Sequence, residues 1–329
     1  MNSSLLPNST RRAMLAAAAL SAFGLTARAQ GFPSKPLRMI AAGTAGGTAD
    51  IVARLIADPL SRGLGQTAFV EPKSGAAGAI AVNDLLQSPH DGHTLLVGVN
   101  SLVSEIPHAV KLKIDMRRSL QPIVELARSG LVLVANPGFP ASNLKDLIAC
   151  VKANPGKFSY ASYSPGTLSH VLGLLLNKEA GLDLTHVGYK GSSPALVDVM
   201  GNNVPLMFDG IGTSLPLLKS GKIKAIAVST PKRSPLLPDV PTFTELGFPN
   251  LEGMSWMGLW CTPDVPSVAQ ARVREAALMI LTQQSVRDRF FELGFEVPAP
   301  RSVSDIVASL KADSARVGSM LQSIGFKPE

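Results

Sequence analysis

The chain has 329 residues, 46% of them hydrophobic and 17% charged, and a formal net charge of +7 at pH 7. Aromatic residues make up only 5%, and no run of Lys or Arg exceeds two residues, so we expect no nucleic-acid partner. The two cysteines and five histidines are scattered along the chain, so we expect no metal site.

The first 29 residues have the three-part layout of an export signal. Arg11 and Arg12 precede a charge-free apolar run over 13–25, and the segment 27–29 (ARA) fits a signal-peptidase site. The run is shorter than the roughly 20 residues that a membrane-spanning helix needs. We therefore expect residues 1–29 to be removed and the mature chain to work in the periplasm. The arginine pair favours the twin-arginine route, although a general secretion signal also fits.

Short apolar runs then alternate with amphipathic patterns. Residues 37–42 have the pattern of a strand, a Gly-rich turn follows, and 49–64 have helical spacing, although Pro59 should weaken or kink that helix. Further strands are predicted at 68–70, 94–99, 131–135, 159–162, 186–189, 206–208 and 225–229. Helices are predicted at 79–86, 143–153 behind Ser142 as cap, 166–180 and 267–283. Another begins at Ser192 or Ser193 and ends at 201–203, one begins at Ser285, and the last runs from Ser302 or Ser304 to 323. The repeated strand–turn–helix order predicts an α/β fold with parallel strands.

Four turns rich in Gly, Ser and Thr lie between a predicted strand and a helix, at 43–50, 74–78, 162–169 and 191–193. In an open parallel sheet such turns gather at the carboxyl ends of the strands, where ligands bind. Free N–H groups at helix starts favour an anion there. One such turn is as easily an ordinary tight turn, but four together indicate a cradle for a carboxylate.

Motifs for catalysis and cofactor binding are absent. The chain has no dinucleotide fingerprint, no phosphate-binding loop and no G-x-S-x-G motif, so we expect no cofactor. Ser169, His170 and Asp209 are the residue types of a catalytic triad. However, Ser169 and His170 are neighbours on one predicted helix, where successive side chains point about 100° apart. We therefore expect no catalytic residues. An exported, cofactor-containing enzyme is the alternative function. Cys150 and Cys261 fit two free thiols better than a disulfide, which export would also permit.

Several segments, in this order, resemble the tripartite tricarboxylate transporter substrate-binding proteins, also called the Bug family. They include PSKPLR at 33–38, GGTAD at 46–50, DGHTLL at 91–96, GTLSH at 166–170, YKGSSPA at 189–195, KRSPLLPDVP at 232–241 and SWMG at 255–258. The resemblance covers about Phe32 to Phe326. It implies a two-lobed, type II-like periplasmic binding protein that closes like a clamshell on its ligand. Lobe one is expected at 32–131 plus 232–329, and lobe two at 132–231.

The resemblance also implies the partners. They are a small organic acid or amino-acid-like ligand and either membrane transporter subunits or a sensor kinase, with the receptor itself a monomer. The ligand-binding residues carried over from the family are Gly46, Gly47, Thr48, Asp50, Gly75, Gly78, Ser162, Gly166, Thr167, Ser169, His170 and Asp209.

Three positions depart from the family pattern. Thr44-Ala45 replaces a Pro-Pro pair, Tyr163-Ser164-Pro165 replaces Ala-Gly-Asn, and Gly210 replaces an Asn. Two roles are open for Asp209. It can brace its own loop, or it can pair with a ligand ammonium group.

Overall fold

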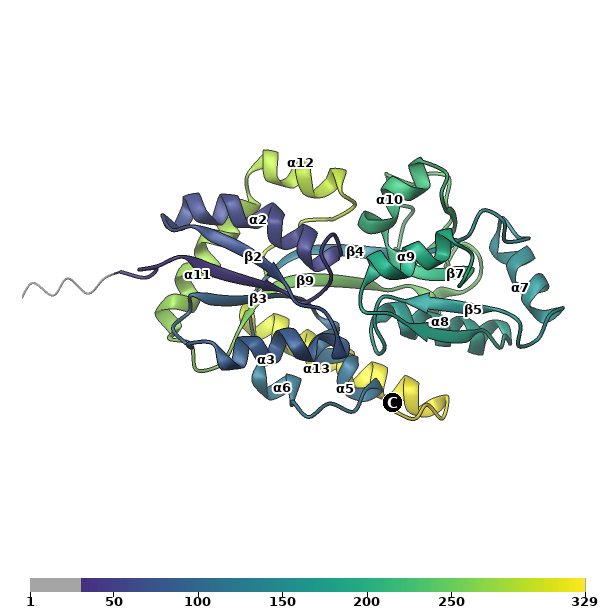
Figure 1. Ribbon diagram of the computed structural model, residues 1–329, viewed down its shortest axis with the longest axis horizontal. Coiled ribbons are helices and arrows are strands. Elements are labelled where there is room, and N and C mark those ends of the chain that lie inside the picture. Colours follow the sequence, from purple (N-terminus) through teal and green to yellow (C-terminus); the bar gives the residue numbers. More distant parts are fainter. Residues whose placement is uncertain (1–30, 329) are drawn as a thin grey trace, which may run out of the picture.

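Strand β4 (Gln121–Ala135) belongs to both halves of the molecule. The structure is a computed structural model that describes residues 31–328 (Figure 1), and the predicted export signal at 1–29 lies outside the described residues. The first part of β4, up to Gly130, pairs antiparallel with β9 (Met254–Cys261). Its last five residues pair with β7 (Leu206–Gly210) and β8 (Lys224–Val228). Two lobes therefore share one continuous strand.

The first lobe is built on a mostly parallel sheet in the order β2-β1-β3-β9-β4. Of its parallel strands, β1 and β3 are almost fully buried because helices cover both faces of the sheet, whereas β2 at the edge is only partly buried. These strands are β1 (Leu37–Ala41), β2 (Ala68–Pro72) and β3 (Thr94–Val99). The covering helices are α2 (Thr48–Leu64), α3 (Ala79–Gln87), α11 (Ser267–Leu281), α12 (Gln284–Glu292) and α13 (Val303–Ser323).

Shorter elements complete this lobe. They are η1 (Ala76–Gly78), α4 (Ser101–Ser104), α5 (Ile106–Ala109) and α6 (Met116–Ser119). Helix α2 runs through Pro59 and ends only at Gly65, whose φ of 70° suits glycine. The expected weak point at Pro59 therefore does not end the helix.

The second lobe repeats the strand–turn–helix scheme around β7, β5 (Ser159–Ser162) and β6 (Thr185–Gly188), which are parallel. Its helices are α7 (Leu144–Lys152), α8 (Leu168–Ala180), α9 (Ser192–Met200) and α10 (Ile211–Lys219), followed later by η2 (Pro249–Leu251). The expected cap Ser142 was wrong by one residue, because the Asn143 side chain accepts the N–H of Asp146 at 2.9 Å.

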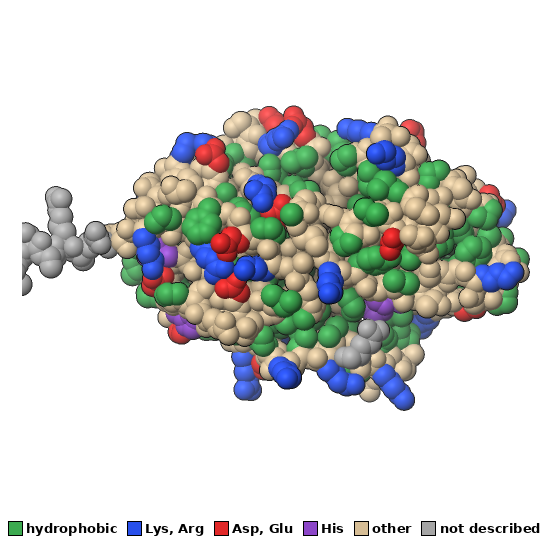
Figure 2. Space-filling view, in the orientation of Figure 1, with side chains coloured by type: hydrophobic (Ala, Val, Ile, Leu, Met, Phe, Trp, Pro, Cys, Tyr) green, Lys and Arg blue, Asp and Glu red, His purple; other side chains and the backbone are tan. Residues whose placement is uncertain are grey.

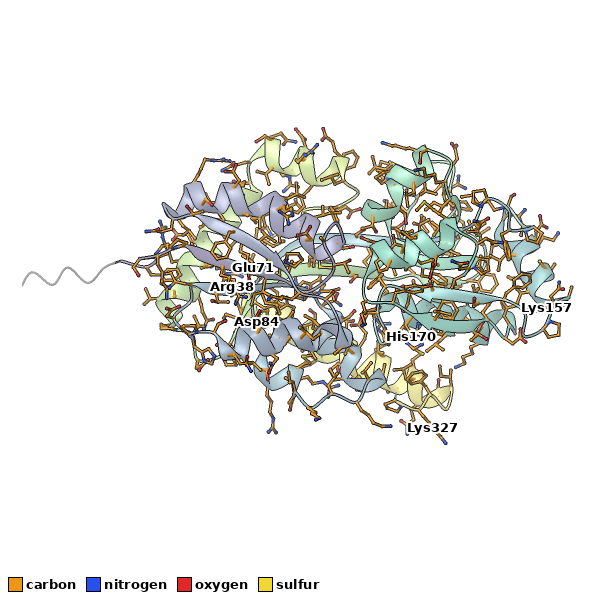
Figure 3. The ribbon with its side chains drawn as sticks, in the orientation of Figure 1. Arg38, Glu71, Asp84, Lys157, His170 and Lys327 are labelled. Atoms are coloured by element: carbon orange, nitrogen blue, oxygen red, sulfur yellow. The ribbon has the colours of Figure 1, made fainter. Side chains whose placement is uncertain are left out.

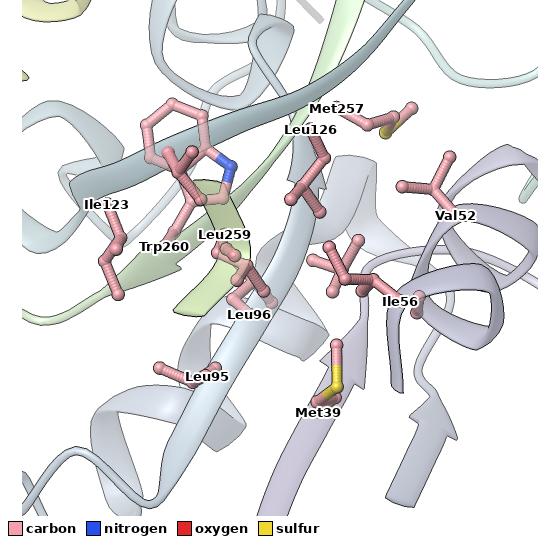
Figure 4. Packing of buried hydrophobic residues seen from close by; sticks show 14 of the residues in the cluster. Met39, Val52, Ile56, Leu95, Leu96, Ile123, Leu126, Met257, Leu259 and Trp260 are labelled. Carbon is pink, nitrogen blue, oxygen red and sulfur yellow. The ribbon is translucent and has the colours of Figure 1, made fainter. Parts of the chain in front are cut away.

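Each lobe has its own apolar core. In the first lobe, Trp260, Leu96 and Ile56 are among the residues that fill the space between sheet and helices (Figure 4). In the second lobe, separate clusters cover the two faces of the sheet. Phe243 and Leu251 lie in one of these clusters. We therefore propose that the chain returns to the first lobe near Gly253, rather than at the boundary of 231/232 expected from the sequence.

Helix α13 reaches from the first lobe to the second. Its Val317 and Leu321 pack with Ala109 of the first lobe and Val171 of α8 in the second. Figure 1 shows the end of α13 beneath α8. Contact between the lobes therefore extends beyond the shared strands.

Cys150 and Cys261 are both free, and burial raises the pKa of the Cys261 thiol to about 12. Within residues 31–328, no cluster of three metal-ligating side chains occurs and no helix is both long and apolar enough to cross a bilayer. Figure 2 shows basic and acidic side chains interspersed over this face of both lobes.

Candidate functional site

A cavity of about 330 Å³ lies between the lobes. Its walls are the turns that follow β1, β2 and β3 in the first lobe and β5, β6 and β7 in the second. Its floor is the hinge, where Leu131 of β4, Trp256 and Met257 of β9, and Phe295 line it. The carboxyl ends of the parallel strands of both sheets therefore meet around one space, as the fold predicts.

The lobes touch each other on both sides of this cavity. Ser193 Oγ of the second lobe donates to the Ala45 carbonyl of the first at 3.2 Å. A Cβ on Gly191 would come within 2.4 Å of Thr44 Oγ1, and one on Gly166 within 3.0 Å of Ile106 Cα. This is a closed arrangement, and glycine permits the close approach.

Five of the residues expected from the sequence line the cavity, namely Gly47, Thr48, Gly75, Gly78 and Thr167. Gly46 and Asp50 lie just behind them. The buried Asp50 carboxylate accepts the N–H of Gly46 at 2.9 Å and the Nε of Arg54 at 3.0 Å. It therefore holds the first turn in shape at the start of α2.

Four other expected residues form a layer behind the turn after β5. Ser162 Oγ lies 2.7 Å from His186 Nε2, and Ser169 donates to the Phe208 carbonyl. The N–H of Gly166 donates to His170 Nδ1 at 3.1 Å. None of the four is among the residues that line the cavity.

Asp209 lies at the end of β7 and is fully buried. Its carboxylate accepts the hydroxyls of Ser192 at 2.5 Å, Thr213 at 2.6 Å and Ser214 at 2.8 Å. Burial raises the pKa of this carboxyl, and the hydroxyl donors oppose that rise. The contacts favour the bracing role, because Asp209 ties the starts of α9 and α10 together and does not line the cavity.

The cavity is electrostatically suited to an anion. None of the described residues that line it is Asp, Glu or His, whereas Lys73 and Lys190 are at its rim. Lys73 lies 3.4 Å from Asp84, and Lys190 is exposed with no ion pair inside 31–328. The helices α2, α9 and α10 all begin at the cavity, so their N-terminal N–H groups add positive potential.

Hydroxyl groups divide into two sets. Those of Thr167, Ser192, Ser129 and Ser255 donate to protein acceptors, Thr167 to the Ser164 carbonyl at 2.7 Å. By contrast, Thr44 Oγ1 is buried and has no hydrogen-bond partner among the described residues. The hydroxyls of Thr48 and Ser74 also have no partner among those residues. The free hydroxyls of Thr44, Thr48 and Ser74 are therefore all on the first lobe, whereas the second lobe offers the N–H groups at the starts of α9 and α10.

Sequence reasoning missed most of the apolar lining. Leu102 and Ile106 of α4 and α5, and Phe295, are not in Gly-rich turns and carry no motif. The three departures from the family pattern gave a usable signal, because Thr44, the segment 163–165 and Gly210 all line the cavity.

Burial raises the pKa of Tyr163, while hydrogen bonds with Thr167 and the Ser169 N–H lower it.

Two α/β lobes, joined by shared strands and closed around a cavity, define a two-lobed ligand-binding protein. A sequence model of the tripartite tricarboxylate transporter family receptor matches residues 52–326, and the chain belongs to this family. The fold class and family expected from the sequence are thereby confirmed.

Individual relatives agree with this assignment. The chain is 30% identical to a UPF0065 protein of Bordetella pertussis over 96% of its own length and 97% of the relative's. It is 33% identical to protein BugT of the same organism over 69% of this chain and 71% of that one.

Solved structures agree as well. The periplasmic binding protein BugD is 30% identical with a TM-score of 0.84, covering 91% of this chain and all of that one. MatC from Rhodopseudomonas palustris with bound malate is 30% identical with a TM-score of 0.81, covering 88% of this chain and 99% of that one. R. palustris Rpa4515 with adipate is 29% identical with a TM-score of 0.85, covering 91% of this chain and 100% of that one.

Proposed function

We propose that this protein captures a small carboxylate in the periplasm and delivers it to a tripartite tricarboxylate-type transporter. The observation that carries the proposal is the cavity itself. Among residues 31–328, no acidic residue lines it, the helices α2, α9 and α10 begin at it, and the hydroxyls of Thr44, Thr48 and Ser74 are free to donate. The malate and adipate bound by two relatives support the ligand class.

We further propose that the cavity binds its ligand without reaction. Among the described lining residues there is no His, Asp, Glu or Cys to act as a base or a nucleophile. Burial raises the pKa of Tyr163, so its phenol stays protonated at neutral pH and cannot take a proton from a ligand. The receptor function of the family supports the same conclusion.

A thermal-shift screen over small carboxylates tests the proposed function. A ligand at about 100 times its Kd adds about 2.7 kcal/mol to the free energy of unfolding, so a true ligand raises the Tm clearly. The matched primary amides are the control, because they keep the shape and remove the charge. Stabilisation by amides but by no carboxylate would overturn the proposal.

Residues 1–29 bear on the site of action. We propose that they direct export and are cleaved after Ala29, because the small residues at 27 and 29 fit the peptidase pattern. N-terminal sequencing of periplasmic protein should start at Gln30. Protein that still begins at Met1 would contradict cleavage. Replacing Arg11–Arg12 by Lys-Lys should reduce export if the twin-arginine route is used.

A further inference from the structure

The two ends of the cavity differ in chemistry. At one end, which we call the polar end, Thr44 and Thr48 of the first lobe face Gly191 and Gly210 of the second. A Cβ on Gly191 would meet Thr44 Oγ1 at 2.4 Å, and one on Gly210 would lie 3.4 Å from Thr48 Oγ1. Two free hydroxyls and the starts of α2, α9 and α10 therefore converge on one small region.

The other end, which we call the apolar end, is formed by Leu102, Ile106 and Val110 with Pro165 across from them. The contacts that a Cβ would make locate this end. One on Gly78 would meet Leu102 at 2.4 Å, and one on Gly166 would meet Ile106 at 3.0 Å. These residues come from the turns after β3 and β5, whereas the polar end comes from the turns after β1, β6 and β7.

At the apolar end, the nearby hydroxyl donors among residues 31–328 already have protein acceptors. The Thr167 hydroxyl donates to the Ser164 carbonyl at 2.7 Å, and the Ser164 hydroxyl donates to the Pro165 carbonyl at 3.4 Å. At the start of α8, the N–H groups of Gly166 and Thr167 donate to His170 Nδ1 and to the Ser164 carbonyl. Lys190 is exposed at the rim, where an ion pair is weakened by solvent.

A ligand ammonium group would also lack a partner. Within the described part of the chain, no carboxylate lines the cavity, and the nearby Asp209 is saturated by three hydroxyls. Burying a charge without a partner is costly. The floor offers instead Leu131, Trp256 and Phe295, which suit an apolar body.

We propose that the cavity selects a monocarboxylate with an apolar body over a dicarboxylate or an amino acid of the same skeleton. The carboxylate lies at the polar end, against Thr44 and Thr48, and the apolar body extends over the hinge toward Leu102 and Ile106. This inference rests on the proposed function, and it differs from a simple transfer of the malate or adipate of the relatives.

Matched ligand pairs test the inference by isothermal titration calorimetry. Hexanoate and adipate differ only in the second carboxylate, and 3-phenylpropanoate and phenylalanine differ only in the ammonium group. We expect the first member of each pair to bind at least 10-fold more tightly. Equal binding, or tighter binding of adipate or phenylalanine, would overturn the selectivity while leaving carboxylate capture intact.

A variant pair gives an independent readout. Val110→Lys puts a cation at the apolar end, so its preference should move toward adipate by at least 10-fold relative to the unmodified protein. Val268→Lys is the control for an added charge, because Val268 is exposed on α11 and does not line the cavity, and this variant should keep the preference for hexanoate. A Val110→Lys protein that folds, as judged by its thermal transition, and still prefers hexanoate to the same degree would overturn the placement of the apolar body. If the unmodified protein bound none of the four compounds and no other carboxylate, the proposed function would fail with the inference.

Discussion

The rings of His170 and His186 stack face to face, with centroids 3.7 Å apart and planes 15° apart. Burial lowers the pKa of His170 to about 3, with the neighbouring His186 as the second cause, and lowers the pKa of His186 to about 4. Phe326, beyond the end of α13, packs edge-on against His170. Figure 3 shows His170 on the side of the second lobe that faces this helix. The pair is therefore held neutral at the contact between the lobes.

The first prediction is acid destabilisation through this pair. Because both pKa values are lower in the folded state, the unfolded chain binds more protons below about pH 6.5, so stability falls as the pH drops from about 6.5 toward 4. Each histidine contributes at most about 1.4 kcal/mol per pH unit in this window. Urea unfolding at pH 7 and pH 4.5 measures the difference.

Replacement variants identify the groups responsible. The double variant His170→Asn/His186→Gln should lose most of this pH dependence. His90→Gln is the control, because contact with Asp264 raises the pKa of the half-buried His90, so that removing His90 cannot lessen the loss of stability in acid. If the free energy of unfolding of the double variant fell just as steeply with pH, groups other than His170 and His186 would cause the acid sensitivity.

The second prediction separates free from engaged hydroxyls. Thr44→Val removes a buried, unpartnered hydroxyl, so affinity for a carboxylate should fall by about 1.5–3 kcal/mol, the range for a charge-assisted hydrogen bond. Stability of the empty protein should not fall. Thr167→Val should show the opposite pattern, because its hydroxyl braces the turn at 164. Calorimetry measures the affinity of both variants, and urea unfolding measures their stability. Equal losses of affinity in the two variants would contradict the division into a free Thr44 hydroxyl and an engaged Thr167 hydroxyl.

The third prediction concerns closure. Gly191→Ala places a Cβ 2.4 Å from Thr44 Oγ1 and at a φ of 137°, so the lobes should no longer close fully. We expect weaker ligand binding and a larger radius of gyration in X-ray scattering with ligand present. Gly181→Ala is the control, since it has a positive φ of 63° but meets nothing within 4 Å. Full compaction of Gly191→Ala by ligand would contradict the prediction.

The fourth prediction concerns Asp209→Asn. The amide has one acceptor oxygen where the carboxylate has two, so the buried hydroxyl of either Ser192 or Ser214 should lose its acceptor. The half-buried Thr213 hydroxyl can turn to the Gly210 carbonyl instead. A buried hydroxyl without an acceptor costs about 1–3 kcal/mol, and the free energy of unfolding should fall by that amount. Ligand preference should stay the same, because Asp209 does not line the cavity. A stable variant with altered preference would restore Asp209 to the binding site.

Much of the fold follows from local patterns in the sequence. Buried parallel strands such as Thr94–Val99 are nearly continuous apolar runs. Of the two serines expected to start α13, Ser302 is the cap, since its hydroxyl accepts the Asp305 N–H. The first ten residues of β4 and all of α10 were missed. Gly130 interrupts the pattern of β4, and Pro216 lies inside α10.

The site could be predicted only in part, because its components come from different ranges of the sequence. The Gly-rich turns pointed to Gly47, Thr48 and Gly78, and all three line the cavity. Of these, Gly78 has a φ of +87°, which favours glycine. Nothing local distinguishes Ser169 behind the wall from Thr167 on it, because only packing decides which way each side chain points. Apolar lining residues such as Ile106 look like any core residue.

Strand β9 has a consequence for how the chain acquires its structure. It pairs with β3 on one side and with β4 on the other, so the sheet of the first lobe lacks its middle strand until residues 254–261 are present. The second lobe, by contrast, draws its sheet from one uninterrupted stretch, beginning at Leu131 and ending at Val228. Local contacts form faster than distant ones. We therefore expect the second lobe to fold first, because the edges of β3 and β4 that pair with β9 stay unpaired until the chain is almost complete.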